Sequence, residues 1–467
     1  MSTQERPSQR SEIARLIGQF DRPGPRYTSY PTALDFHDGI TPTLYKEHLR
    51  EASKHPDESL SIYIHLPFCE ERCLFCGCHV IISPDKEKAL PYLDLLEREI
   101  DLIMPELGDR KKVSQLHLGG GTPTYQTPEQ LDRLMCKLEE NFEFIEGCEK
   151  AVEVDPRVTK PEHLAVLAKH GFNRISLGVQ DLTPEVQVAI HRIQSKELTA
   201  NLVTTARELG FKGVNVDLIY GLPHQTVETF VQTVQAVIDM GCDRAAVYSF
   251  AYVPWVRGHQ KMMETATLPE PEEKAALFAA AREVFLANGF EPIGMDHFAL
   301  PTDELAKARK IGKLRRNFQG YAVIPATDVI GLGISSIGDV GGLYVQNAKK
   351  LTTYRAAIEA GELSAERGVL REGDDELRRA VIHDLMCNFK IDVQAHEERF
   401  GINFMEYFAP DLELLNPLVE EGLAIVGHNQ VEATPIGELF VRNLAICFDR
   451  RIREKKETSG PSFSQTV

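Results

Sequence analysis

Four cysteines lie within residues 69–78, and this loop constrains the fold more than any other stretch of the sequence. Cys69, Cys73 and Cys76 form a C-x3-C-x2-C array, and Cys78 follows two residues after the third. Spacing this tight cannot be divided among separate helices or strands, so one loop must turn several sulfur atoms toward a common centre. Thiolates gathered in this way suit zinc or an iron–sulfur cluster.

The remaining cysteines argue against zinc. A structural zinc site normally draws its ligands from two separated cysteine pairs, whereas the other cysteines stand alone at Cys136, Cys148, Cys242, Cys387 and Cys447. Three thiolates on a four-iron cluster leave one iron open to bind a substrate. With the aromatic Phe75 before its third cysteine, the array resembles the signature of the radical S-adenosylmethionine (SAM) enzymes. We therefore prefer an iron–sulfur cluster to zinc or to a disulfide.

A short β-rich run followed by a helical run recurs along the middle of the chain. The expected strands are Leu60–His65, Gln115–Leu118, Ala151–Val154, Arg174–Val179, Val214–Ile219 and Arg244–Phe250. The expected helices are Pro91–Met104, Pro128–Asn141, Pro161–His170, Lys196–Leu209, Thr226–Met240 and Pro271–Asn288, several with proline at the start and glycine after the end. Such units predict an α/β fold with a parallel sheet, an incomplete (β/α)6 TIM-like barrel. The cysteine loop begins at the C-terminal end of the first strand, where barrels of this kind place their chemistry.

The segments around the barrel differ in character, and we divide the chain accordingly. Residues 1–58 begin irregularly and continue as an extended, proline-rich arm at Pro23–Ala33. Residues 59–300 form the barrel, and residues 301–366 are a glycine-rich, loop-like connection that completes the active site. Residues 367–453 predict a mostly helical, winged-helix-like C-terminal domain. We expect the tail, residues 454–467, to be disordered.

The charge balance limits the partners of the chain. Lys+Arg 52 against Asp+Glu 69 gives a formal net charge of −17, which opposes binding to nucleic acid or to anionic membrane surfaces. We find no signal peptide among the first residues and no apolar run approaching the roughly 18 residues that a membrane span needs. The unpaired cysteines fit a reducing compartment. We therefore expect a cytoplasmic protein that holds any anionic ligand in a local basic pocket.

Polar residues mark the ends or interiors of several expected strands. A glycine run, residues 119–121, follows the second strand. Glycines at this position allow either a tight turn or close contact between the backbone and a ligand. Glu153 and Asp217 interrupt apolar strands, and Gln180 ends another. Inward-facing polar residues on successive strands predict a pocket, although each alone could face solvent. Solvent exposure is also the default expectation for Arg192.

Longer motifs give a specific resemblance that covers about residues 20 to 450. The motifs are PRYTSYPTA (25–33), HLPFC (65–69), CGC (76–78), VDPR (154–157), DLIYGLP (217–223) and GMDHF (294–298). Together they are similar to those of the oxygen-independent coproporphyrinogen III oxidases, also called coproporphyrinogen dehydrogenases, which are radical SAM enzymes. The resemblance implies that Cys69, Cys73 and Cys76 bind a [4Fe–4S] cluster and that Cys78 does not ligate iron.

The resemblance also implies sites for two SAM molecules. Contacts of the SAM that chelates the open iron correspond to Tyr63, Gly120, Glu153 and Ile337. Contacts of a second SAM correspond to Phe75, Gly121, Thr122, Gln180, Arg192, Asp217 and Ala251. In this family a radical derived from SAM removes hydrogen from the β-carbon of a propionate, and loss of CO2 and one electron leaves a vinyl group. Two such steps convert coproporphyrinogen III to protoporphyrinogen IX in anaerobic haem biosynthesis, and no acid–base residue is required.

The expected partners are coproporphyrinogen III and a reducing electron donor of unknown identity, and the family likeness favours a monomer. The alternatives are a haem chaperone, another radical SAM enzyme acting on a tetrapyrrole, and a DNA-binding regulator. The charge of −17 opposes the regulator, and the chaperones typically lack both the fourth cysteine and the arm.

The arm has two interpretations. Its Arg26, Tyr27 and Tyr30 suit a flat anionic substrate, with a guanidinium for a carboxylate and rings for stacking. We expect this contact; the alternative is that the arm only closes the open side of the barrel and packs against the sheet.

Overall fold

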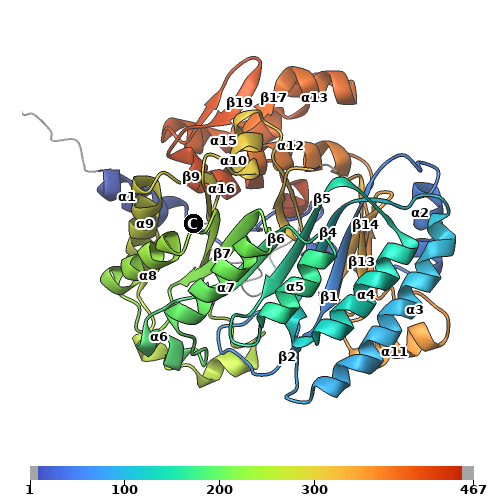
Figure 1. Cartoon of the computed structure of the whole chain (residues 1–467). Helices are drawn as coiled ribbons and strands as arrows, with labels where there is room; N and C mark the ends of the chain where they lie inside the picture. Colours follow the sequence, from blue (N-terminus) through green and yellow to red (C-terminus); the bar gives the residue numbers. More distant parts are fainter. Residues whose placement is uncertain (1–8, 325, 455–467) are drawn as a thin grey trace, which may run out of the picture.

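A run of parallel strands forms the centre of the computed structural model, which describes residues 9–324 and 326–454 (Figure 1). The strands predicted from the sequence all form, as β1 (Leu60–Leu66), β4 (Lys112–Gly120), β5 (Glu143–Val154), β6 (Arg174–Gln180), β7 (Gly213–Tyr220) and β8 (Arg244–Ser249). They pair in this order, each parallel to the next. The predicted α/β fold with an incomplete barrel is confirmed.

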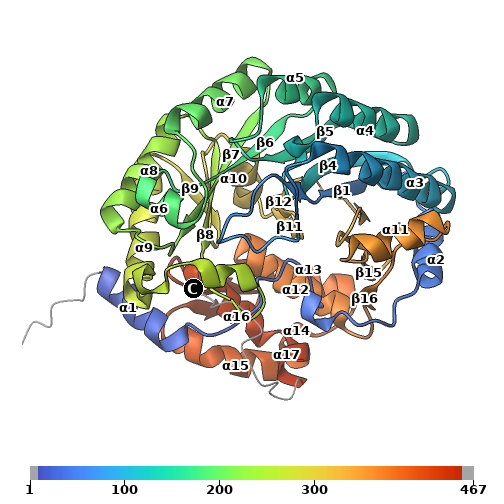
Figure 2. The same ribbon diagram turned by 90° about the horizontal axis from the view of Figure 1, so that it is seen from below.

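Helices cover the outside of these strands, as Figure 2 shows. They are α3 (Leu90–Leu107), α4 (Pro128–Asn141), α5 (Pro161–Lys169), α6 (Pro184–Ala189), α7 (Lys196–Glu208), α8 (Val227–Asp239) and α9 (Pro271–Ala287). Capping residues define where several of these helices begin and end. The side chains of Thr127 and Gln130 each accept a hydrogen bond from the other's backbone N–H and form a capping box at the start of α4. Gly171 and Gly210 follow α5 and α7 with φ of 77° and 90°, a backbone conformation that favours glycine.

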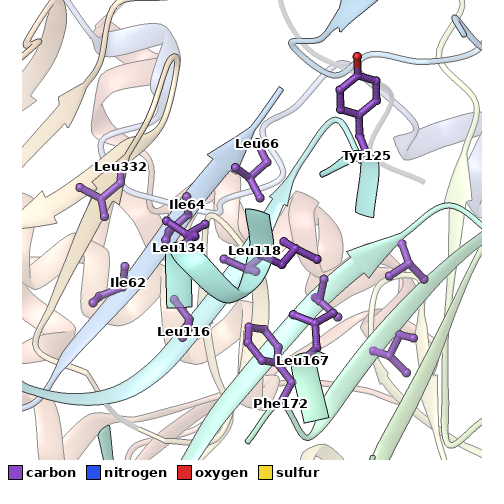
Figure 3. Packing of buried hydrophobic residues seen from close by; sticks show 14 of the residues in the cluster. Ile62, Ile64, Leu66, Leu116, Leu118, Tyr125, Leu134, Leu167, Phe172 and Leu332 are labelled. Carbon is purple, nitrogen blue, oxygen red and sulfur yellow. The ribbon is translucent and has the colours of Figure 1, made fainter. Parts of the chain in front are cut away.

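Side chains along each strand point alternately to the hydrophobic core and to the barrel interior. Ile62 and Ile64 of β1 are fully buried and lie with Leu116 of β4 and Leu134 of α4 in the core between sheet and helices (Figure 3). Burying each such side chain stabilises the fold by about 1.5–3 kcal/mol. Side chains on a strand alternate between its two faces, so the residues between these, such as Tyr63, point into the barrel.

The segment 301–366, which we expected to be rich in loops, extends the sheet instead. It contains α10 (Glu304–Lys310), β11 (Arg315–Asn317), β12 (Gly320–Ala322), β13 (Asp328–Leu332), β14 (Ile337–Val340), β15 (Leu343–Gln346) and α11 (Leu351–Glu359), with β16 (Arg367–Leu370) just beyond. β13 pairs in parallel with β1, and β14, β15 and β16 follow in antiparallel order. β10 (His297–Ala299) and β9 (Glu291–Gly294) continue the other edge, so the sheet has 12 strands.

The N-terminal region contains helices where we expected irregular chain, namely α1 (Gln9–Phe20), the 3-10 turn η1 (Ala33–Asp35) and α2 (Pro42–Ala52). The rings of Tyr27 and Tyr30 belong to a second hydrophobic core, built mainly by the C-terminal region. The Tyr27 hydroxyl donates a hydrogen bond to Asp449 at 2.8 Å. The prediction that these rings stack on a substrate is therefore wrong, because burial in this core already uses their apolar surface.

The C-terminal region is mostly helical, as predicted. It contains α12 (Asp375–Asn388), α13 (Val393–Phe400), α14 (Phe404–Tyr407), α15 (Ala409–Glu420), α16 (Val441–Cys447) and α17 (Arg450–Glu454). A small sheet joins β17 (Lys390–Asp392), β19 (Gln430–Ala433) and β18 (Ala424–Val426) in that order. In Figure 1 this region lies at the top, whereas β2 (Phe68–Cys69), which carries the first cysteine, lies at the bottom. The C-terminal region therefore lies at the opposite end of the barrel from the cysteine loop.

The remaining short elements are β3 (Ile81–Ile82), η2 (Lys86–Ala89), η3 (Pro123–Tyr125), η4 (Gly258–Met262), η5 (Thr265–Thr267) and η6 (Gly437–Phe440). Within residues 9–324 and 326–454, no helix combines the length and the apolar character needed to cross a membrane. The predicted disordered tail lies outside the described residues except for Glu454, which ends α17. The domain boundaries that we drew from the sequence stay predictions.

Candidate active site

The cysteine loop lies at the C-terminal end of β1, beside the glycine run that follows β4. Cys69 Sγ is 3.5 Å from the hydroxyl oxygen of Thr122. Cys73 Sγ lies 3.3 Å from Nη2 of Arg157 and 3.5 Å from Nη1 of Arg192. Guanidinium groups at this distance are attracted to negative charge on a sulfur ligand. The loop thus presents sulfur ligands with positive charge placed to offset them.

Cys69, Cys73 and Cys76 are free cysteines of one loop, and three thiolates from one loop are a ligand set of a [4Fe–4S] cluster. Among the described residues, a group of three potential metal ligands with all ligand atoms within 4.8 Å of one another is formed by Asp132, Cys136 and His170, not by these three cysteines. At least one pair of the three sulfur atoms is therefore farther apart than 4.8 Å. Zn–S bonds of about 2.3 Å would place the sulfurs of a tetrahedral zinc site about 4 Å apart.

A buried carboxylate holds the two arginines in place. Asp155 Oδ2 accepts hydrogen bonds from Nη2 of Arg157 at 2.7 Å and from Nη1 of Arg192 at 2.8 Å. Burial alone would raise the pKa of Asp155, but the two guanidinium groups hold it below its ordinary value. The Arg192 side chain is only 6% exposed, so our default expectation of solvent exposure is wrong. The sequence showed Asp155 within a family motif but did not reveal this bridging role.

The glycine run brings two loops into close contact. A Cβ atom on Gly121 would lie 2.6 Å from the backbone of Pro67, in the stretch that leads into the cysteine loop. Gly120 has φ of 113°, and its N–H donates a hydrogen bond to Glu153 Oε2 at 3.2 Å. Contacts within the chain are therefore enough to require glycine at positions 120 and 121, without any contact to a ligand. The predicted SAM contacts of Gly120, Gly121 and Thr122 stay predictions, although all three residues adjoin the cysteine loop.

A cavity of about 480 Å³ opens beside this loop at the C-terminal ends of the strands. Its lining contains Tyr63, His65, His79, Glu153, Val256, Arg257, Phe318, Gln319, Ser335, Ile337, Gln346 and Lys349. Three of the four residues predicted to contact the first SAM, Tyr63, Glu153 and Ile337, are thus brought together. The rest of the lining was missed, because loops and hairpins without a short motif supply most of it.

Glu153 supplies negative charge to this cavity. Its Oε1 lies 3.0 Å from Nε2 of His117. Burial opposes ionisation, but the hydrogen bonds from His117 and from the Gly120 N–H hold the pKa of Glu153 below its ordinary value. An ionised carboxylate that is still 43% exposed suits a cationic or hydroxyl-bearing ligand.

A second cavity of about 150 Å³ adjoins the first, and both Glu153 and Asp217 line it. Asp217 accepts hydrogen bonds of 2.9 Å from Ser176 Oγ and from Asn215 Nδ2. Burial, with the nearby charge of Glu153, raises the pKa of Asp217 to about 6. The prediction that polar residues on successive strands mark a pocket is confirmed for these two carboxylates.

The other residues predicted to contact a second SAM meet in pairs. Gln260 Nε2 donates to the backbone oxygens of Ala251 at 3.1 Å and Phe75 at 3.4 Å and so joins the two segments. A Cβ atom on Gly178 would meet both Gln180 Nε2 and Arg192 Nη2. The sequence therefore selected residues that are neighbours in space. Their binding roles stay predictions.

Comparison with known proteins identifies the fold and the family. The model of the Radical SAM superfamily matches residues 63–237, and that of the HemN C-terminal domain matches residues 372–440. The solved structure of coproporphyrinogen III oxidase (HemN) from Escherichia coli, described as a radical SAM enzyme, is 42% identical with a TM-score of 0.89. That match covers 94% of this chain and 98% of the other.

Two curated relatives give the same result. The oxygen-independent coproporphyrinogen III oxidase of Salmonella typhimurium is 43% identical, and the match covers 97% of this chain and 98% of the relative. That of Pseudomonas aeruginosa is 42% identical over 94% of this chain and 95% of the relative. Identity at this level over nearly the whole of both chains leads to one conclusion. The chain belongs to the oxygen-independent coproporphyrinogen III oxidase family of radical SAM enzymes.

Proposed function

We propose that this protein decarboxylates two propionate side chains of coproporphyrinogen III oxidatively, leaving the vinyl groups of protoporphyrinogen IX. The observation that carries the proposal is the array of Cys69, Cys73 and Cys76 beside a cavity whose wall contains Glu153, a carboxyl with a lowered pKa. The names of full-length relatives support the same reaction.

The residues of the chain have distinct roles in this scheme. Cys69, Cys73 and Cys76 hold the cluster, and Arg157 and Arg192 offset negative charge at Cys73. When bound, the reduced cluster and SAM supply the radical that removes a hydrogen atom from the substrate. Glu153 binds the ammonium or ribose of SAM in the cavity. The protein contributes orientation and shelter from water rather than acid–base catalysis.

Glu153→Ala is expected to weaken SAM binding by about 1.5–3 kcal/mol, roughly tenfold to a hundredfold in Kd, because a charge-assisted hydrogen bond is lost. Equilibrium dialysis of the reconstituted protein measures this directly. Glu153→Gln keeps the shape and removes the charge, and Glu140→Ala removes an exposed carboxylate on α4 as a control. SAM affinity that is the same in all three variants would show that Glu153 binds something else.

We further propose a cytoplasmic location, a monomeric state and a separate reducing electron donor. The nine free cysteines of the chain support a reducing compartment.

The proposed function predicts that the substrate stimulates SAM cleavage. Anaerobically reconstituted protein with a chemical reductant is expected to cleave SAM slowly alone and several times faster with coproporphyrinogen III. Protoporphyrinogen IX, in which vinyl groups replace the reacting propionates, is expected to leave the rate unchanged. A haem chaperone, or an enzyme for another tetrapyrrole, would show no stimulation specific to coproporphyrinogen III.

A further inference from the structure

Two cationic side chains, Arg257 and Lys349, line the cavity that contains Glu153. Arg257 lies in the segment after β8, and Lys349 follows β15. In the strand order β8 and β15 lie toward opposite edges of the sheet. Residues that follow strands near both edges of the sheet therefore line the same cavity.

Hydrogen bonds tie both cation-bearing segments to the cysteine loop. Nε2 of His259 lies 3.0 Å from the backbone oxygen of Cys76, which fixes the segment that carries Arg257. Nε2 of His79 lies 2.6 Å from the backbone oxygen of Lys349. The two cations are therefore attached to a frame that also positions the ligands of the cluster.

Neither cation has a side-chain partner among the residues that the structure describes. Within the described residues, no hydrogen bond or ion pair involves the guanidinium of Arg257 or the ammonium of Lys349. Other arginines near the site are already paired, since Arg192 bonds to Asp155 and Arg26 forms an ion pair with Asp296. A chain of net charge −17, with carboxylates in the same cavities, needs unpaired local cations to hold a polycarboxylate.

We propose that Arg257 and Lys349 bind two propionate carboxylates of the tetrapyrrole at the mouth of the cavity, an assignment that rests on the proposed function. Arg257, partly buried, presents a planar fork that matches a carboxylate with two parallel hydrogen bonds. Lys349, exposed, acts as a point charge that water and salt screen. The carboxylate of SAM has the same chemistry, and the test below separates the two sources.

The single tryptophan of the chain is a built-in reporter. Trp255 is 63% exposed and lies two residues from Arg257. Quenching of its fluorescence follows the binding of coproporphyrin III to anaerobically reconstituted protein. Arg257→Ala is expected to raise the Kd roughly tenfold or more and Lys349→Ala about threefold. Arg257→Lys is expected to restore part of the affinity.

Matched control variants distinguish direct contact with the porphyrin from a general effect of removing a positive charge. Lys261→Ala and Lys350→Ala remove exposed cations close in sequence to Arg257 and Lys349 but outside the cavity lining, and they are expected to leave the Kd unchanged. The tetraamide of coproporphyrin III, which lacks the negative charges, is expected to bind wild type weakly and to be insensitive to Arg257→Ala.

Three further results would overturn the assignment. One is porphyrin affinity unchanged in Arg257→Ala while wild type binds well. Another is a higher Kd for SAM in Arg257→Ala or Lys349→Ala than in wild type, measured by dialysis without porphyrin. That result would assign the cations to the carboxylate of SAM. Failure of wild type to bind coproporphyrin III would overturn this assignment, whereas the proposed function is tested separately by the turnover of coproporphyrinogen III. An unchanged Kd for SAM together with weaker porphyrin binding supports the assignment.

Discussion

Replacing Cys69, Cys73 or Cys76 with serine is expected to remove the iron–sulfur cluster and all SAM cleavage. Serine offers a hard, protonated hydroxyl in place of a soft thiolate, and the loop has no spare ligand with the same spacing. The variants are expected to lack the brown chromophore and to contain little iron or sulfide after anaerobic reconstitution.

Cys78→Ser is the matched control for this prediction. Cys78 is exposed at the end of the same loop, and we do not expect it to bind iron. Its serine variant is expected to keep the iron and sulfide content of wild type. A Cys78→Ser protein without iron, or a Cys73→Ser protein with a full cluster, would contradict the assignment of the ligands.

Asp155→Ala is expected to destabilise the fold by about 3–5 kcal/mol, because it leaves buried arginines without their carboxylate. The side chains of Asp155 and Arg192 are 10% and 6% exposed. Urea unfolding of the reconstituted protein measures the loss. Because the folded pKa of Asp155 lies below its ordinary value, this stabilisation is present above about pH 4 and fades as the pH falls further.

The surface ion pair of Asp57 with Lys112 provides the comparison. Their side chains are 94% and 40% exposed, and Asp57→Ala is expected to cost less than about 1 kcal/mol. If the two alanine variants unfolded at the same urea concentration as wild type, Asp155 would not be the residue that holds Arg192 and Arg157 beside Cys73.

The sequence predicted the barrel because its strands and helices carry strong local signals. Alternating apolar residues mark β1, and proline and glycine mark the helix ends. The strands after residue 325 were missed because Gly331 and Gly338 weaken the β pattern. In the structure, a Cβ atom on Gly331 would lie 2.8 Å from the backbone of Ile337, so close approach of the chain requires glycine there. Contact between distant segments, rather than local preference, explains these strands.

In the site too, residues with a local sequence signal were predicted, and residues that depend on distant contacts were not. Cysteine spacing and the strand carboxylates Glu153 and Asp217 pointed to a ligand pocket, because charge inside an apolar strand needs a reason. The burial of Arg192 depends on Asp155, a partner distant in sequence, and composition gives no sign of it. Tyrosines that could stack on a substrate, such as Tyr30, have the same chemistry as tyrosines that fill a core. Only the packing of the C-terminal region distinguished them.

The product formed from coproporphyrinogen III tests the central claim most directly. Anaerobically reconstituted protein, supplied with SAM, a reductant and an electron acceptor, is expected to yield protoporphyrinogen IX, identified by mass spectrometry as a tetrapyrrole that has lost two carboxyl groups and two further hydrogen atoms. The Cys73→Ser variant is expected to return the substrate unchanged. Unchanged coproporphyrinogen III after incubation with cluster-loaded wild-type protein that cleaves SAM would contradict the claim.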